Sequence, residues 1–114
     1  MDVEITAAAK EDLKRFEKPV RETFYSKIDS IEKNLNLGAT PSQAFDKYLG
    51  GNMNPVLQIN LGRDYRAWFI EGEYLEGESY DQNTVYCFKV LTKKEAQKLT
   101  EKIPDAITFL QSLL

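Results

Sequence analysis

The chain has 114 residues and a formal net charge of −3; 42% of its residues are hydrophobic and 29% are charged. This length and composition are typical of one folded domain with a modest core, and they exclude a mainly disordered chain. No apolar run approaches the roughly 18 residues of a membrane-spanning helix, and residues 1–10 lack the pattern of a secretion signal. We therefore expect a cytoplasmic protein that makes no membrane contact.

Histidine is absent from the chain, and Cys87 is its only cysteine. These two facts exclude a disulfide within the chain, a cysteine-rich zinc site and any catalytic couple built on histidine. The stretch from 71 to 81 holds five acids and no bases, but it lacks the ordered spacing of a calcium loop. We therefore expect neither a metal ion nor a cofactor. Any proton transfer must use carboxylates, lysines, tyrosines or substrate groups.

The first third of the chain reads as a short strand followed by two helices. Polar and apolar residues alternate over 2–6, and Thr6 can cap a helix that continues to Phe16. Pro19 ends this helix and suits the first turn of the next one. Hydrophobic residues then recur at helical spacing up to a terminating glycine: Val20, Phe24, Ile28, Ile31, Leu35 and Gly38. These features predict a helical hairpin.

The middle of the chain changes from a helical period to a period of two. Residues 40–42 predict the start of a short helix that carries Ala44, Phe45, Tyr48 and Leu49 and ends at 50–52. Residues 56–61 and 65–70 then alternate as two strands joined by a tight turn over 62–64. The expected core face holds Leu57, Ile59, Leu61, Tyr65, Ala67 and Phe69, and the other face holds Val56, Gln58, Asn60, Arg66, Trp68 and Ile70.

The next segment predicts a loop, a third strand and the start of a helix. Residues 71–84 are polar, and residues 85–91 read as a strand. Thr92 and Glu95 have the spacing of a capping box, which begins a helix. One face of the third strand is expected to hold Tyr86, Phe88 and Val90.

Pro104 either kinks the C-terminal helix or separates it from a second one. Residues 104–114 can form a helical extension that folds back on the monomer or makes a homodimer interface, through an apolar stripe of Ile107, Leu110 and Leu114. Strands and helices are segregated along the chain, which favours an α+β fold. We expect one domain over 1–114, with an N-terminal strand and a helical hairpin packed on a small antiparallel sheet, followed by a C-terminal helix.

Segment 57–69 carries the most specific pattern: an alternating strand, a Gly-Arg-Asp turn, then Tyr65, Arg66 and an apolar strand. Together with the segment 12–16 near the start and a lysine pair at 93–94, this order resembles the RelE/ParE superfamily of toxins from type II toxin–antitoxin systems. The resemblance covers residues 2 to about 100. It implies a cytoplasmic growth inhibitor that is held silent by a cognate antitoxin protein.

The two branches of this superfamily imply two functions. The RelE branch contains metal-independent endoribonucleases, or mRNA interferases, which inhibit translation by binding and cleaving mRNA on the ribosome. The ParE branch inhibits DNA gyrase and is not known as a nuclease. RelE-like cleavage is the first hypothesis. The alternative is a non-catalytic toxin-fold protein, either a ParE-like gyrase inhibitor or an inactive binding module.

RNA cleavage without a metal requires a base for the 2′-hydroxyl, stabilisation of charge on the phosphate, and a proton for the leaving oxygen. Arg66 matches the arginine that the family places on its active sheet face, and it is the candidate phosphate clamp, unless it is solvated or paired with Asp64. The candidates for neutralising charge are Lys89, Lys93 and Lys94, which equally fit an ordinary lysine-rich surface.

Gln58 and Asn60 stand where RelE-like ribonucleases carry lysines, so they can orient a substrate but supply neither charge nor a base. Arg63 is a further candidate for substrate binding. Trp68 lies on the face of Gln58 and Asn60 by strand parity, and it either stacks on a base or packs beneath the C-terminal tail. Residues 92–114 lack the tyrosine or histidine of the RelE branch, which together with the acidic balance favours the non-catalytic alternative.

Overall fold

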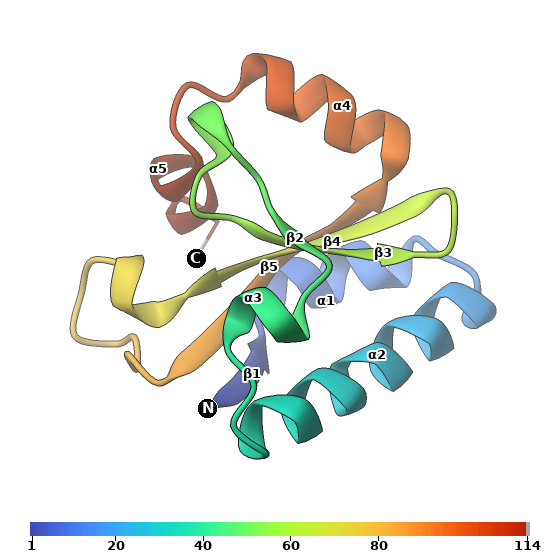
Figure 1. The fold of residues 1–114 in the computed structure, drawn as a ribbon. Coiled ribbons are helices and arrows are strands. Elements are labelled where there is room, and N and C mark those ends of the chain that lie inside the picture. Colours follow the sequence, from blue (N-terminus) through green and yellow to red (C-terminus); the bar gives the residue numbers. More distant parts are fainter. Residues whose placement is uncertain (114) are drawn as a thin grey trace.

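The computed structural model describes residues 1–113 and has an α+β architecture of three layers, with helices on both faces of one sheet (Figure 1). The strands are β1 (Asp2–Ile5), β2 (Lys47–Tyr48), β3 (Leu57–Leu61), β4 (Tyr65–Glu71) and β5 (Thr84–Thr92). The helices are α1 (Ala7–Lys14), α2 (Lys18–Asn36), α3 (Pro41–Ala44), α4 (Lys93–Lys102) and α5 (Ala106–Gln111). Within residues 1–113, no helix has the length and apolar character needed to cross a membrane.

The sheet has the strand order β1-β5-β4-β3-β2; its antiparallel part is as expected from the sequence, and the N-terminal strand adds a parallel pair that makes the sheet mixed. Strands β2 to β5 pair in antiparallel fashion, whereas β1 lies parallel to β5. Local alternation of side chains predicts a strand but carries no information about which distant strand lies beside it.

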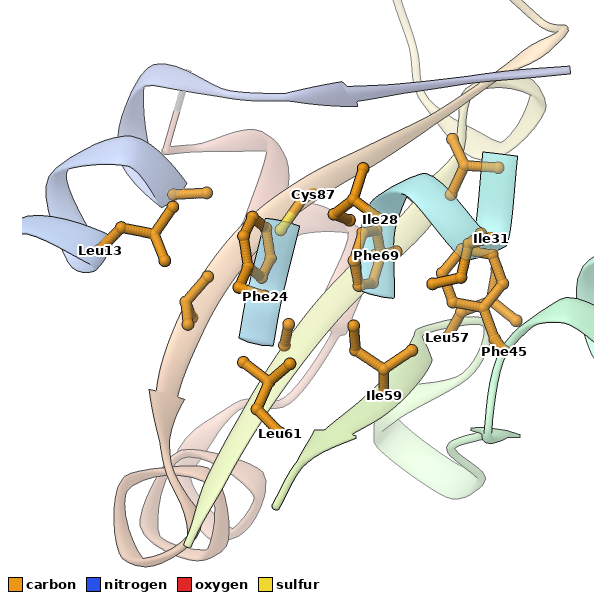
Figure 2. Close-up of a cluster of buried hydrophobic side chains, with 14 of the residues drawn as sticks. Leu13, Phe24, Ile28, Ile31, Phe45, Leu57, Ile59, Leu61, Phe69 and Cys87 are labelled. Carbon is orange, nitrogen blue, oxygen red and sulfur yellow. The ribbon is translucent and has the colours of Figure 1, made fainter. Parts of the chain in front are cut away.

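One face of the sheet is covered by α1 and α2, as the helical-hairpin prediction requires (Figure 1). Figure 2 shows α2 side chains lying against those of β3 and β4 in this core. The α2 stripe of Phe24, Ile28, Ile31 and Leu35 is buried, and it meets the strand faces of Leu57, Ile59, Leu61, Ala67 and Phe69. The start of α1 is also confirmed, because the Thr6 hydroxyl accepts a hydrogen bond from the Ala9 amide at 3.3 Å.

The second face of the sheet is covered by α4, α5 and a 3-10 turn over Gly51–Met53 (Figure 1). Trp68 lies at the centre of this second core and is fully buried. Pro104 separates two helices rather than kinking one, and α5 packs back on the same chain through Ala106 and Leu110. The last position of the expected apolar stripe, Leu114, lies outside the described residues.

A bulge in β5 changes the expected alternation of its side chains. Trp68 pairs with Lys89 and Phe69 pairs with Cys87, so Phe88 has no partner on β4. An extra residue shifts every later side chain to the opposite face. Tyr86 and Phe88 therefore enter the second core while Val90 enters the first, which corrects the prediction that these three residues share a face.

The segment after α3 also differs from the prediction, because the helix ends at Ala44 and β2 follows it. The Leu49 amide donates to the Val56 carbonyl at 2.8 Å, and the Asp46 amide donates to the Gln58 carbonyl at 3.1 Å. Pairing with β3 satisfies these backbone groups at the sheet edge, which a longer helix could not do. Sheet formation therefore replaces helix over these residues.

Beyond the end of β1, the edge of β5 has no strand from the described part of the chain beside it, and a side chain of α1 supplies a hydrogen-bond acceptor there instead. Asp12, which is 8% exposed, accepts a hydrogen bond from the Val90 amide at 3.0 Å. The other oxygen of the same carboxylate pairs with the Lys89 ammonium at 3.2 Å. The Asp12 carboxylate thus takes the place of the next strand at this edge.

Replacing Asp12 should destabilise the fold more than replacing its lysine partner. Asp12→Ala leaves the buried Val90 amide without an acceptor and Lys89 without its partner, at a cost of about 2–4 kcal/mol in the free energy of unfolding. Lys89→Ala should cost less, because Asp12 still accepts from Val90. Urea denaturation measures both, with Glu11→Ala on the exposed face of α1 as the control. A larger loss for Lys89→Ala than for Asp12→Ala would contradict this account.

Candidate functional site

A cleft of about 600 Å³ lies between α4 and the sheet face formed by β2, β3 and β4. We call it the α4 cleft. Its walls contain Lys47, Leu49, Gly50, Met53, Gln58, Arg66, Lys93, Ala96, Gln97, Thr100 and Glu101. Three of the residues expected to act together on sequence grounds, Gln58, Arg66 and Lys93, are brought together here.

Strand register and helical spacing place these side chains. Lys47 pairs with Gln58 across β2 and β3, and paired residues share a face of the sheet. From the other side, α4 contributes Lys93, Gln97 and Glu101, which lie four residues apart and share one helix face. The start of α4 is fixed by a capping box and by the Lys93 amide, which donates to the Asp64 carbonyl at 2.8 Å.

Arg66 is held beside the turn of the β3–β4 hairpin by hydrogen bonds from one of its guanidinium nitrogens. Its Nη1 donates to the carbonyls of Tyr65 at 2.7 Å, Arg63 at 3.2 Å and Gly62 at 3.3 Å. Within residues 1–113, no carboxylate pairs with it, so the expected alternative of an Asp64 partner is not found. Nε and Nη2 make no hydrogen bond in this part of the chain and remain as donors toward a ligand.

The charge of the α4 cleft is positive although the chain as a whole is acidic. Three cationic side chains line it, and Glu101 is the acid among its lining residues. Within residues 1–113, none of the three cations forms an ion pair. A concave surface with excess positive charge concentrates anions.

The amide of Gln58 is oriented by the buried indole of Trp68. The indole Nε1 donates to Gln58 Oε1 at 3.0 Å, and an indole nitrogen can only donate. Gln58 Nε2 is therefore the donor atom of the amide, and one of its two N–H groups donates to Asn60 Oδ1 at 3.5 Å. The α4 cleft thus meets an amide donor on this wall, which adds to its preference for anions.

Trp68 itself is 0% exposed, which corrects its candidacy for stacking on a base. The alternative, packing beneath the C-terminal segment, is confirmed by its place in the second core. Its chemical contribution to the site is the orientation of Gln58.

The other candidates lie outside the α4 cleft. The ammonium of Lys89, a candidate for neutralising charge, is instead paired with Asp12 at the edge of β5. Arg63 lines a separate hollow beside α2, and Lys94 lines another beside Tyr65. Asn60 pairs with Arg66 across the hairpin and is exposed, but it does not line the cleft.

Sequence reasoning missed Lys47, because the segment around it reads as helix. Its strand is two residues long, which is too short for alternation to reveal. On the opposite face of the same strand, the Tyr48 hydroxyl donates to Glu71 Oε1 at 2.5 Å. This bond ties β2 to the end of β4 and so fixes the backbone that carries Lys47.

Glu71 is 6% exposed, and this burial raises the pKa of its carboxyl above the usual range, although the hydrogen bond from Tyr48 opposes the change. Burial, followed by the nearby Glu71 carboxylate, also raises the pKa of Tyr48. Burial likewise raises the pKa of the Cys87 thiol, which makes it a poor nucleophile. No group of acids and cysteines that could hold a metal ion occurs in the described part of the chain.

Comparisons with known proteins found a solved structure of low similarity and no matching family. No family model matches the chain, and no curated protein does. Among solved structures, a copper-bound mutant toxin from Helicobacter pylori resembles it with a TM-score of 0.49 and 11% sequence identity. The alignment covers 83% of this chain and 97% of that one. A likeness this distant assigns no function to the chain.

Trp68→Phe should destabilise the protein by about 2–3 kcal/mol, because it leaves Gln58 Oε1 without its donor and opens space in a closed core. Urea denaturation measures the change, and Tyr74→Phe, at an exposed position, is the control. A loss no larger than that of the control would contradict the role given to the indole.

Glu71→Gln should change the dependence of stability on pH. A raised pKa means that the folded chain binds the Glu71 proton more tightly than the unfolded chain does. The stability that Glu71 contributes is therefore complete below about pH 4 and falls as the pH rises through the folded-state pKa. The difference in unfolding free energy, wild type minus Glu71→Gln, should decline over this range and then level off.

Urea denaturation at a series of pH values tests the Glu71 prediction. Glu78→Gln, an exposed change in the same acidic loop, should give a difference that barely varies with pH. A difference for Glu71→Gln that stays constant with pH would show that the carboxyl titrates normally.

Proposed function

We propose that the chain is the toxin component of a type II toxin–antitoxin system and that its α4 cleft binds the phosphate backbone of RNA. The observation that carries this proposal is the convergence of Lys47, Arg66 and Lys93 on one cleft in an acidic chain. The resemblance of residues 57–69 to the RelE/ParE hairpin supports the same conclusion. The expected partners are a cognate antitoxin and, for an active nuclease, the ribosome and mRNA in the cytoplasm.

The proposed cleavage relies on electrostatic stabilisation. Arg66, anchored through Nη1, offers its remaining N–H groups to the scissile phosphate as negative charge develops there. Lys47 and Lys93 add positive charge from β2 and α4. Proton transfer falls to the lysines and Glu101, the titratable side chains of the cleft other than Arg66.

The composition of the α4 cleft supports the non-catalytic alternative as a second candidate function. The lining residues of the α4 cleft include no tyrosine or histidine, and Lys89 is engaged by Asp12. A cleft that binds but does not cleave would suit a ParE-like gyrase inhibitor or an inactive binding module. The two candidates predict the same binding residues but different products.

Induced expression without an antitoxin, with growth and mRNA 5′ ends recorded, tests the proposed function. Wild type should arrest growth with codon-phased cuts that need the ribosome. Arg66→Ala should reduce cleavage by about 100-fold, because it removes donors to the developing charge. Lys93→Ala should weaken it less.

Neighbouring changes outside the α4 cleft provide matched controls for this experiment. Lys94→Ala and Arg63→Ala each remove one positive charge close in sequence to Lys93 and Arg66, respectively. Because both residues line other hollows, these changes should leave growth arrest nearly unchanged. Growth arrest without cuts would favour the non-catalytic alternative. Arrest that Arg66→Ala and Lys93→Ala do not relieve would contradict the assignment of the cleft.

A further inference from the structure

We propose that Lys47 and the Gln58 amide form one phosphate-binding pair across β2 and β3. This inference rests on the proposed function of the α4 cleft and names a binding residue for it. Both side chains line the cleft, and strand register sets them directly opposite each other. Directly opposed residues of antiparallel strands have Cβ atoms about 5 Å apart, so both can reach one ligand group.

The ammonium group of Lys47 is not neutralised by any carboxylate among residues 1–113. Lys47 is exposed and forms no ion pair with residues 1–113. The acid next to it, Asp46, is engaged elsewhere: its Oδ2 accepts from the Asn60 amide at 2.6 Å and lies 3.9 Å from the Lys27 ammonium. The structure thus keeps the adjacent acid from neutralising Lys47.

The backbone under Lys47 is held on three sides. The Asp46 amide before it donates to Gln58 of β3, and the Leu49 amide after it donates to Val56, the residue that precedes β3. On the far face, the Tyr48 hydroxyl binds Glu71. A lysine whose Cα is fixed in this way loses less conformational freedom on binding than one on a mobile loop.

The Gln58 amide complements the Lys47 ammonium because both are donors. Trp68 occupies Oε1, and Nε2 donates one of its two N–H groups to Asn60 Oδ1 at 3.5 Å, so the second N–H is the donor that remains for a ligand. Ammonium and amide N–H groups together match the several acceptor oxygens of a phosphate. The cleft also has an apolar wall of Leu49, Met53 and Ala96, against which a nucleoside can pack. This combination favours an RNA phosphodiester over an acidic peptide.

Binding of a fluorescein-labelled single-stranded RNA of mixed sequence, measured by anisotropy over a series of KCl concentrations, tests the pair. Each phosphate contact contributes about 0.7 to the slope of log affinity against log salt for single strands. Lys47→Ala should weaken binding and reduce the magnitude of this slope by about 0.7. Lys47→Arg should restore it, because it retains the charge.

Lys98→Ala, an exposed change on α4 outside the cleft lining, is the matched control for loss of one positive charge. Arg66→Ala reports on the cleft itself, and thermal unfolding checks that each variant is folded. If Arg66→Ala weakens RNA binding while Lys47→Ala behaves like Lys98→Ala, the role of Lys47 is overturned and the proposed function stands.

A second probe separates this inference from the proposed function. Inorganic pyrophosphate, titrated while the Lys47 side-chain resonances are followed by NMR, should shift those resonances in wild type and less in Gln58→Leu. Such shifts without RNA binding would retain the phosphate-binding pair and overturn the RNA function. Stronger binding of an acidic peptide than of RNA, with the same dependence on Lys47, would overturn the phosphate assignment.

Discussion

The burial of Trp68 links the second core of the protein to the wall of the α4 cleft. Its side chain lies on the face of β4 opposite the α1–α2 hairpin, so the sheet must be covered on both faces. α4, α5 and the 3-10 turn supply that cover. The α4 cleft lies between α4 and the strands that carry Gln58 and Arg66. The buried indole also needs an acceptor, since an unmatched donor costs about 1–3 kcal/mol. Gln58 provides the acceptor and thereby joins the core to the cleft wall.

The sheet edges decide which charges remain for a ligand. At β5, no strand of residues 1–113 pairs with Val90 on the side of α1, so its amide donates to Asp12, and Asp12 in turn forms an ion pair with Lys89. At β2, Asp46 binds the Asn60 amide, which leaves Lys47 facing the cleft. Lysine therefore has a structural role at one edge, where Lys89 pairs with Asp12, and remains available to a ligand at the other edge, where Lys47 lines the α4 cleft. Composition alone cannot separate these two uses, because they depend on where backbone donors lack a partner.

Periodic segments of the fold were predictable, and the exceptions have a common cause. The helical stripe of α2 and the first-core faces of β3 and β4 follow from local spacing, because the hydrophobic residues of each element fall on one face that packs in the core. The bulge at Phe88 and the strand β2 arise from pairing with strands distant in sequence. The same cause shaped the site: Arg66, Gln58 and Lys93 were found on regular elements, whereas Lys47 was hidden in a segment that reads as helix.

The α4 cleft is positive although the chain carries an excess of acids, five of them within residues 71–81. Arg66 stands near the start of β4 and Glu71 at its end. Five residues of extended strand separate them by roughly 17 Å, which exceeds the screening length of about 8 Å at physiological salt. Glu71 also faces away from the cleft, toward Tyr48. The fold therefore places Arg66 and Glu71 at opposite ends of one strand, so that Glu71 does not cancel the field at Arg66.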